Sequence, residues 1–269
     1  MAKLSYQNSN FIETFAIKIF VIVMIAAIYV ILANKGNFKI NKTQFSTLLY
    51  IAIVATLFAE LIYFYAFTKI PVVNAVLIGH FQPIFIVLIG YFILKEEKLN
   101  RLDYFGIFFM IIAGLLVSTR TLDNLKILRI GTLGDFLVLI SAILWATTAI
   151  AMRKNLQGLS AGVISFYRYL IASILFAVYL ILTSKIIILN IYQVLVGVVT
   201  GIGSILYYQG LKRLKASQVG ALELSTPFFA SILSFIILGE VTTFMQGIGI
   251  IFLLIGIYFI SKKEEVYFK

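Results

Sequence analysis

Residues 11–33 read FIETFAIKIFVIVMIAAIYVILA, and this stretch decides the class of fold. Its only charged side chains are Glu13 and Lys18. About 20 consecutive, mainly apolar residues in a helix cross the roughly 30 Å hydrocarbon core of a bilayer. The apolar run is longer than the h-region of a signal peptide, and it has no clear small-residue cleavage site. The stretch therefore predicts a transmembrane helix that the mature protein retains.

Comparable stretches recur along the chain, and the overall composition is that of a membrane protein. Of the 269 residues, 62% are hydrophobic and 12% are charged, whereas soluble domains have about 45–50% apolar and about 25% charged residues. The connecting segments are too short to form a separate soluble domain. We therefore predict an all-α, polytopic membrane helix bundle with nine transmembrane helices, at residues 11–33, 45–66, 71–94, 103–119, 134–152, 161–184, 189–208, 216–238 and 243–261.

The formal net charge of +11 is distributed in a way that predicts membrane orientation rather than nucleic-acid binding. Of the 22 Lys and Arg residues, 14 fall in one set of alternate loops and 6 in the other, while Lys18 and Arg168 lie inside spans. An excess of basic residues marks the cytoplasmic loops of membrane proteins. We therefore expect a multi-pass protein of the plasma membrane with a cytoplasmic C-terminus and, with nine spans, an extracellular N-terminus.

The residues needed for most catalytic and cofactor chemistry are missing from the sequence. The chain has no cysteine and one histidine, which excludes thiolate sites and a His-Glu-x-x-His metal site. It contains no Gly-x-x-x-x-Gly-Lys-Ser/Thr loop, which argues against nucleotide hydrolysis. We expect neither a metal nor a cofactor, and we expect that the protein is not an enzyme.

The chain contains an internal repeat. Residues 78–85, IGHFQPIF, align with residues 222–229, LELSTPFF, at an offset of 144, and Lys18 matches Arg168 at an offset of 150. The first four predicted spans therefore recur as the sixth to ninth. Equivalent spans are five apart, which is an odd number, so they cross the bilayer in opposite directions. This is an inverted-topology repeat, which many transporters use for alternating access.

A longer pattern surrounds the second copy of this motif. Pro227 in mid-helix is followed by about a dozen apolar residues, then by Leu238-Gly239-Glu240 and a Gly-rich last helix. The order and duplication of these features resemble the EamA-type transporters of the drug/metabolite transporter superfamily. The first copy is weaker, because Lys95-Glu96 replaces Gly-Glu.

The resemblance covers nearly the whole chain and implies ten helices in two inverted five-helix repeats. It also implies export or uptake of amino acids and other small metabolites across the plasma membrane. We assign residues 1–121 to a first EamA-like repeat and residues 131–263 to a second one. The first repeat lacks its first helix, so either the start codon is misplaced or the chain has nine spans.

Ionisable residues inside spans are the first candidates for transport chemistry, because an Asp, Lys or Arg at a helix centre costs about 2.5–3.5 kcal/mol on insertion scales. The principal candidate is Glu223, four residues before Pro227, whose ring removes the hydrogen bond that the Glu223 carbonyl would accept. A buried carboxylate there would exchange protons with the solute pathway, or it would only pack its helix. His80 lies one position from the repeat equivalent of Glu223 and is either part of the substrate or proton pathway or an ordinary interior residue.

Three further ionisable residues lie within spans. Glu60 lies in the outer half of its span, where it either lines an external vestibule or pairs with a basic residue such as Lys69. Lys18 and Arg168 lie about two turns from the ends of their spans. We expect their long side chains to snorkel to the interface and to have a structural or topological role.

Prolines and aromatic residues complete the predicted transport pathway. Pro83 and Pro227, at matching depths in their helices, are predicted hinges. Trp145, with Tyr207 and Gln209, is predicted to form an aromatic, weakly polar cavity wall. The alternative for Trp145 and Tyr207 is anchoring at the lipid interface, where both residue types are common.

We therefore predict a secondary active transporter that moves a small organic metabolite, an amino acid or a similar solute, by alternating access and in the direction of export. Its partners would be the solute and the lipid bilayer, and a homo-oligomer is left open. One rival is a non-transporting membrane scaffold or assembly protein, in which apolar replacement of Glu223 and His80 would be tolerated. An intramembrane enzyme is less favoured, because the chain has few residues with which to build a catalytic site.

Overall fold

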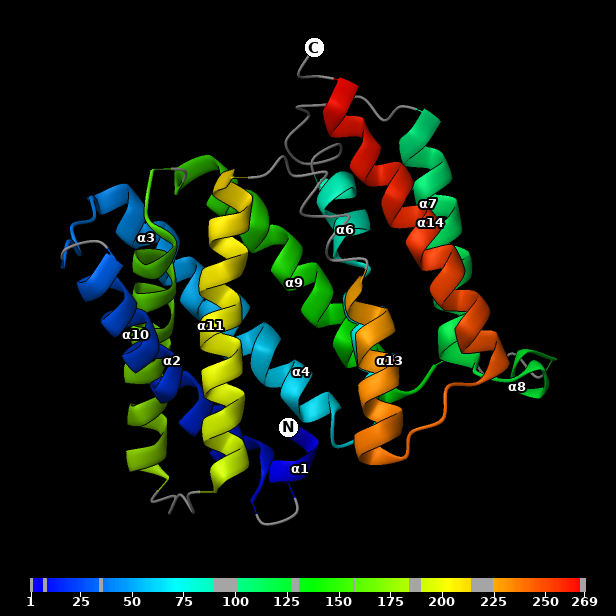
Figure 1. The fold of residues 1–269 in the computed structure, drawn as a ribbon, viewed down its shortest axis with the longest axis horizontal. Coiled ribbons are helices and arrows are strands. Elements are labelled where there is room, and N and C mark those ends of the chain that lie inside the picture. The colour runs from blue at the N-terminus through cyan, green and yellow to red at the C-terminus, as the bar shows by residue number, and fades with distance from the viewer. Residues whose placement is uncertain are drawn as a thin grey trace. The chain divides into compact units, whose positions relative to one another are not determined.

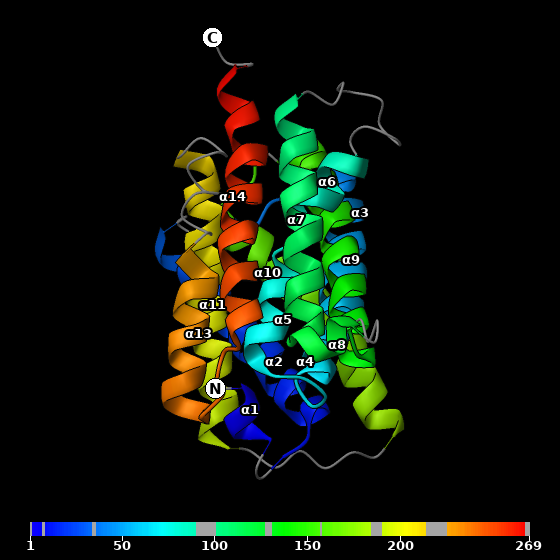
Figure 2. The ribbon, with the colours of Figure 1, turned by 90° about the vertical axis from the view of Figure 1, so that its right-hand side faces the viewer.

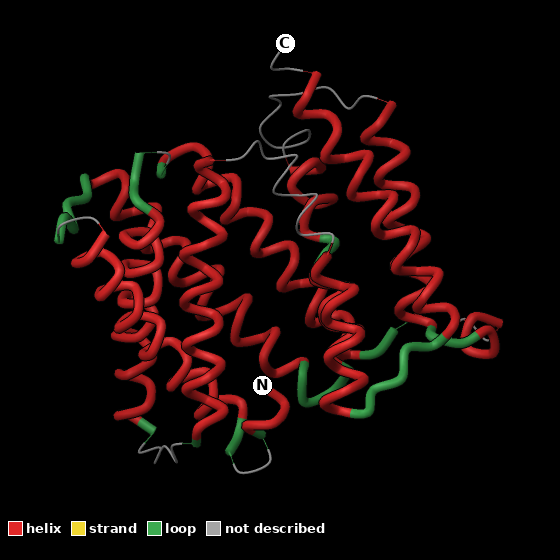
Figure 3. The backbone as a smooth tube through the Cα atoms, viewed as in Figure 1, coloured by secondary structure: helices red, strands yellow, loops and turns green. Residues whose placement is uncertain are grey.

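The computed structural model describes residues 2–6, 9–33, 36–89, 101–126, 131–156, 158–183, 190–213 and 225–266. Within these residues the protein is all helical and contains no strand (Figures 1 and 3). The elements are α1 (Ala2–Ser5), α2 (Phe11–Ala33), α3 (Lys42–Ile51), the π-helix η1 (Ala52–Glu60), α4 (Leu61–Ala66), α5 (Val72–Gly79), α6 (Gln82–Ile89), α7 (Arg101–Thr119), α8 (Leu122–Lys126), α9 (Leu133–Asn155), α10 (Ala161–Leu182), α11 (Ile191–Arg213), α13 (Ser225–Leu238) and α14 (Phe244–Val266).

Several of these helices are long and apolar enough to cross a membrane, which confirms a multi-pass, all-helical architecture. The five clear candidate spans are Phe11–Ala33, Lys42–Ala66, Leu133–Met152, Ala161–Leu182 and Ile191–Gln209. Three shorter apolar helical segments fall within other predicted spans, at Val72–Ile86, which includes α5 and part of α6, and at Tyr104–Val117 and Phe244–Phe259. The other four predicted spans contain only these shorter segments and α13, so they stay predictions.

The helix predicted over 71–94, with a hinge at Pro83, is interrupted within its described residues. α5 ends at Gly79, His80 has φ −74° and ψ 7°, and α6 begins at Gln82. Pro83 has no N–H with which to continue the hydrogen-bond ladder to the Gly79 carbonyl, whereas its fixed φ suits the first turn of a new helix. The interruption at His80 thus lies three residues before Pro83, the predicted hinge, and hinge motion itself stays a prediction.

Paired residues three positions apart explain why several helices begin where they do. The first residue of each pair caps the helix, and the side chain of the second accepts a hydrogen bond from the backbone N–H of the first. In α3, for example, Asn41 N donates to Gln44 Oε1 at 2.8 Å and Gln44 N donates to Asn41 Oδ1 at 2.8 Å. The pairs are Asn10/Glu13, Asn41/Gln44, Thr132/Asp135, Asn190/Gln193 and Thr243/Gln246.

Residues 1–68 and 148–213 form one compact unit. Within it α2 packs against α10 and α11, and α10 also packs against η1. Gly197 on α11 permits the close approach to α2, since a Cβ at this position would lie 2.6 Å from the Val21 side chain and 3.1 Å from the Lys18 carbonyl. The Phe15 ring fills the core between neighbouring helices and contacts the Phe176 ring with centroids 5.2 Å apart.

Residues 69–147 and 214–269 form the second compact unit. Its longest helices, α7 and α14, lie side by side (Figures 1 and 2), and α5 packs against α13. A Cβ at Gly256 would lie 2.9 Å from the Gly106 carbonyl, so glycine is needed where these two backbones meet. Phe109 of α7 stacks on Phe252 of α14, with ring centroids 5.6 Å apart. Each unit therefore takes helices from both halves of the sequence.

Candidate functional site

Three ionisable side chains meet inside the first unit, around the carboxylate of Glu60. Lys18 Nζ of α2 donates to Glu60 Oε2, and Arg168 Nη2 of α10 donates to Glu60 Oε1. Tyr169 adds a hydroxyl bond to Glu60 Oε1 at 2.9 Å. We call Lys18, Glu60 and Arg168 the buried triad.

The triad is almost completely withdrawn from solvent. The side chains of Lys18, Glu60 and Arg168 are 1%, 10% and 12% exposed, respectively, and each lies within a candidate membrane span. An ion of this size has a large desolvation penalty in such surroundings, so it persists only when it is paired and hydrogen-bonded. Two cations share one carboxylate, so the triad carries a formal charge of +1 when all three groups are ionised.

Arg168 is fixed by three partners on two elements, η1 and α11. Its Nε donates to Thr56 Oγ1 of η1 at 2.8 Å, and its Nη1 donates to Tyr208 Oη of α11 at 3.0 Å. Glu60 takes the remaining bond through Nη2. Each nitrogen of the planar guanidinium therefore donates once, and the group can rotate only if several bonds break together.

Lys18 lies in an aromatic environment. Its Nζ is 4.4 Å from the Phe64 ring centroid, 5.1 Å from that of Phe15 and 5.9 Å from that of Tyr169. Rings at these distances stabilise an ammonium group through their quadrupoles, particularly where water is excluded. Lys18 shares its only carboxylate partner with Arg168, and the aromatic rings thus supply further stabilisation of its ammonium group.

The carboxylate is held by an unusual stretch of backbone. Thr56 and Glu60, which both bind Arg168, belong to η1, the π-helix between α3 and α4. π-helical segments are rare, and they occur frequently at functional sites because their wider winding changes the direction of side chains. The same span therefore contains the only triad carboxylate and a local departure from α-helix geometry.

The structure corrects the expectation for the two basic residues. Snorkelling of Lys18 and Arg168 to the interface is wrong, because both side chains point inward and bind Glu60. Glu60 finds its basic partners in these two residues. The triad itself was not predicted from the sequence. Its available signal was the alignment of Lys18 with Arg168 in the repeat, which places two cations at equivalent depths near one carboxylate.

The other predicted pathway residues have mixed positions. His80 forms the C-cap of α5, and its Nδ1 lies 2.7 Å from the Val76 carbonyl oxygen. Pro83 lies in the first turn of α6 and Pro227 in the first turn of α13. Glu223 lies outside the described residues. Hinge motion at the prolines and proton exchange at Glu223 and His80 stay predictions.

The predicted cavity wall also stays a prediction. Tyr207 is 43% exposed, and its ring centroid lies 5.7 Å from that of the buried Tyr208. Gln209 donates through Nε2 to Tyr29 Oη. Trp145 is partly buried on the part of α9 that belongs to the second unit. Tyr208, which binds Arg168, is therefore the residue of this aromatic group that contacts the triad.

Metal binding finds no support in the part of the chain that the structure describes. No group of three or more His, Cys, Asp or Glu side chains is close enough there to hold a metal ion. The triad places one titratable carboxylate between two fixed cations.

Residues 1–119 and 132–262 match the model of the EamA-like transporter family. The match covers most of the sequence, so the chain belongs to this family of membrane transporters. It confirms the family resemblance inferred from the repeated proline motif and the Leu-Gly-Glu sequence.

Curated relatives are also transporters by name. An uncharacterized transporter of Methanothermobacter thermautotrophicus is 30% identical over 231 residues, which are 84% of this chain and 67% of the relative. An uncharacterized transporter of Synechocystis sp. is 26% identical over 233 residues, which are 81% of this chain and 66% of the relative. The matched region thus spans about two thirds of the length of each relative.

A solved crystal structure has the same overall fold. It is 18% identical in sequence, and the similarity has a TM-score of 0.65 over 100% of this chain and 93% of the solved one. At this level of identity the similarity shows the fold alone.

Proposed function

We propose that the protein is a secondary active transporter that exports a small organic metabolite, such as an amino acid, across the plasma membrane by alternating access. The observation that carries the proposal is the buried triad, in which one cation from each half of the chain shares a single carboxylate. Ionisable groups within membrane spans commonly mark solute and proton pathways. Because the chain belongs to a transporter family, the triad is the principal candidate for such a pathway in this protein.

Recurring helix starts support an inverted repeat as the basis of alternating access. α2 and α10 begin 150 residues apart, α3 and α11 begin 149 apart, and α7 and α14 begin 143 apart. The first spacing equals the offset between Lys18 and Arg168 in the sequence. α3 and α11 are also both preceded by an Asn-x-x-Gln pair. Two nearly equal halves can exchange inward-open and outward-open shapes with little difference in free energy.

In the proposed cycle, the triad changes between two arrangements, one with Glu60 ionised and one with Glu60 protonated. Protonation of Glu60 would remove its attraction for both cations, and α2 and α10 would then lose their common partner on η1. A proton that moves down 100 mV releases about 2.3 kcal/mol, enough for roughly a fifty-fold solute gradient. Glu223 and His80 are proposed as further proton-carrying groups, Pro83 and Pro227 as hinges, and Trp145, Tyr207 and Gln209 as substrate contacts.

The proposed topology has nine spans and a cytoplasmic C-terminus. Within the first unit, Tyr167 Oη donates to the Phe38 carbonyl at 2.9 Å and Asn155 Nδ2 donates to Thr47 Oγ1 at 2.9 Å. The connections before α3 and after α9 are therefore at one end of this unit, and the basic-residue count assigns both to the cytoplasm.

A C-terminal tag tests this topology. The tag should react with an impermeant reagent only after the cells are permeabilised; labelling of intact cells would reverse the proposed topology.

Flux into proteoliposomes tests the transport proposal. Wild-type protein should move at least one member of an amino-acid panel against its gradient when a proton gradient is imposed. Glu60→Gln should lower this driven flux at least tenfold and remove its pH dependence. Glu13→Gln is the matched control, because it neutralises another carboxylate of the same unit at a capping position where an amide serves equally well.

The flux experiment distinguishes an error in the proposed solute class from an error in the role of the triad. Wild-type protein that moves no member of the panel would contradict the proposed solute class. A folded Glu60→Gln protein with wild-type flux and unchanged pH dependence would remove the triad from the mechanism. Glu223→Gln in the same assay tests the second proposed carboxylate, and unchanged pH dependence would exclude it from coupling.

A further inference from the structure

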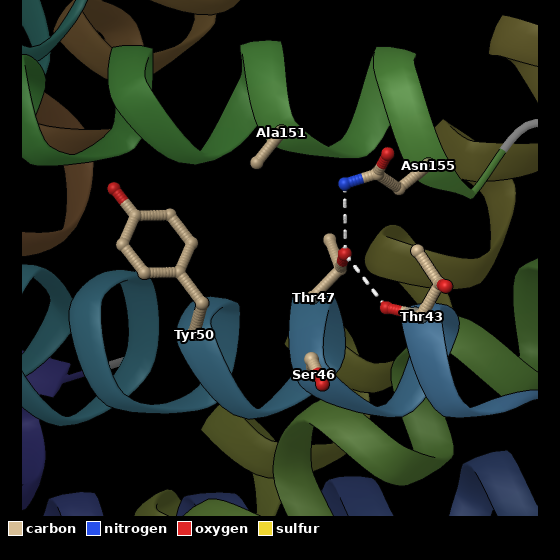
Figure 4. A pocket seen from close by; sticks show the side chains of 6 residues that line it. All are labelled: Thr43, Ser46, Thr47, Tyr50, Ala151 and Asn155. Atoms are coloured by element: carbon tan, nitrogen blue, oxygen red, sulfur yellow. Dashed lines mark hydrogen bonds between the residues drawn. The ribbon is translucent and has the colours of Figure 1, made fainter.

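A polar pocket lies between α3 and α9 in the first unit, apart from the buried triad. Its volume is about 340 Å³, which is within the range of small-molecule sites. Figure 4 shows Thr43, Ser46, Thr47 and Tyr50 on one helix and Ala151 and Asn155 on the facing helix. The short side chain of Ala151 leaves the space between the Tyr50 ring and the Asn155 amide open (Figure 4).

Polar atoms of the lining remain available for a ligand. Asn155 Nδ2 donates one hydrogen bond to Thr47 Oγ1 at 2.9 Å, and Thr47 Oγ1 donates to the Thr43 carbonyl at 3.0 Å. The amide nitrogen has a second N–H. Among the described residues, neither the Thr43 hydroxyl nor Asn155 Oδ1 makes a hydrogen bond. The pocket thus offers two donors and one acceptor at its open end.

The ends of the candidate spans place the pocket at the depth expected for lipid headgroups. Thr43 is the second residue of the candidate span Lys42–Ala66, and Asn155 lies three residues beyond the candidate span Leu133–Met152. Tyr50 is seven residues further into its span, or about 10 Å at 1.5 Å per residue. A molecule in this pocket would therefore have its polar part at the membrane surface and its remainder beside the apolar part of the span.

The charge around the pocket has one sign. Residues 34–50 and 151–168 contain no Asp or Glu, whereas Lys42 is the first residue of α3 and Lys154 lies near the end of α9. The same stretches of sequence also contain Lys35, Lys39 and Arg153. Lys42 is one turn from Ser46 and Lys154 is three residues from Ala151, so both exposed lysines border lining positions. Basic pockets between membrane helices on the cytoplasmic side are suited to anionic headgroups.

We propose that the pocket binds the headgroup of an anionic glycerophospholipid. The phosphodiester oxygens accept from Thr43, Asn155 and the two lysines, headgroup hydroxyls donate to Asn155 Oδ1, and the acyl chains lie beyond Tyr50. The site is independent of the proposed transport function, because it uses neither the triad nor any predicted pathway residue.

Native mass spectrometry of the full chain in detergent tests the proposal with phosphatidylglycerol as the probe. Phosphatidylglycerol should bind at least tenfold more tightly than phosphatidylcholine. Lys42→Gln with Lys154→Gln should weaken its binding about 25-fold, since each surface lysine contributes about fivefold. Lys98→Gln with Arg101→Gln removes the same charge from the proposed cytoplasmic side elsewhere in the chain, and it should change binding by less than about twofold.

Ala151→Leu separates a pocket from general charge attraction, because it fills the space and leaves every charge in place. It should abolish phosphatidylglycerol binding while the unfolding temperature in detergent stays near that of wild type. If this variant does not fold, Thr43→Val, which removes one hydroxyl, should weaken binding a few-fold. Full binding by a folded Ala151→Leu protein, or equal losses in the two double variants, would overturn the proposal. Equal competition by inorganic phosphate would assign the pocket to a soluble anion and would also overturn it.

Discussion

The interiors of the two units are held together by different kinds of polar contact. In the first unit, three ionisable groups meet within candidate membrane spans. In the second unit, the side chains of Asn74, Gln246 and Asp135 are joined in series, because Gln246 Nε2 donates to Asn74 Oδ1 and Asn74 Nδ2 donates to Asp135 Oδ1 at 3.2 Å. The residues of this series are almost fully buried.

The position of each network along its helices differs as well. Asn74, Asp135 and Gln246 each occupy the third residue of a helix, at the starts of α5, α9 and α14. Arg120, just past the end of α7, contributes one ion pair to Asp135 at 3.5 Å. The second network therefore lies at helix ends, where backbone groups without a partner inside their own helix need other hydrogen-bond partners. Glu60 precedes α4, but its side chain makes no capping hydrogen bond there, and it follows eight other residues of the π-helix.

Under the proposed function, this difference assigns the transport role to the buried triad and a structural role to the second network. Capping pairs and amide bonds between helices stabilise a fold by modest amounts and need no change of charge. Charges in the middle of a span have a large desolvation penalty, so they are expected where a transporter needs groups that exchange partners. Predictions for the two units therefore differ in size and in the property affected.

The largest effect is expected for Glu60→Gln, which leaves Lys18 and Arg168 buried without a carboxylate. Loss of one partner from a buried ion pair costs about 3–5 kcal/mol, so we expect a destabilisation of that order in reversible unfolding in mixed micelles. The triple variant Lys18→Met, Glu60→Gln and Arg168→Met should recover most of this stability but no transport. A triple variant as unstable as the single one would show that packing, rather than charge, explains the loss.

A smaller effect is expected at the contact between α2 and α11. Gly197→Ala places a methyl group 2.6 Å from the Val21 side chain and close to the Lys18 carbonyl, and overpacking of this kind costs about 1–3 kcal/mol. Gly203→Ala is the control on the same helix, because a Cβ there would meet nothing within 4 Å. The control should be neutral or more stable in the same unfolding experiment; equal destabilisation of both variants would refute close packing as the cause.

Asn74→Leu should have a still smaller effect, and this one concerns stability alone. It removes hydrogen bonds from Asp135 and Gln246 while it keeps the same branching at Cγ, with an expected loss of about 1–2 kcal/mol. Driven flux in proteoliposomes and its pH dependence should remain those of wild type. A change of pH dependence would break the contrast between the units, because the amide network would then belong to the transport mechanism.

The smallest effect is expected for Thr243→Val at the start of α14. The Thr243 hydroxyl accepts from Gln246 N at 3.3 Å and donates to the Arg120 carbonyl at 2.7 Å. Loss of a cap costs about 1 kcal/mol, so the unfolding free energy should fall by about that amount. Thr243→Ser, which keeps the hydroxyl, should restore it, and equal losses in both variants would rule out the cap.

Much of the helical framework could be predicted from the sequence, because an apolar run of span length has few alternatives in a bilayer. The expected span 11–33 coincides with α2, and the expected span 161–184 coincides with α10 to within two residues. The interruption at His80 was not predicted, although Pro83 was recognised as a possible hinge. A proline in an apolar run either kinks a helix or starts a new one, and local sequence does not decide between these outcomes.

The buried triad could be predicted only in part. Lys18, Glu60 and Arg168 were recognised as costly inside a span, but their partners depend on which helix faces are turned toward one another. Helix periodicity places a residue on a face without identifying the neighbouring helix. Long basic side chains two turns from a span end can also reach water. The sequence therefore does not distinguish snorkelling of Lys18 from the inward position that this side chain takes where α2 packs against α10.

The paired residues at the helix starts bear on how the chain enters a membrane. Each pair satisfies N–H groups of a new span from within four consecutive residues, before any other helix is present. A helix that enters the bilayer during synthesis with such a pair exposes fewer unsatisfied backbone N–H groups to lipid at its N-terminus. Satisfaction of these N–H groups therefore does not depend on which neighbouring helices have already been made.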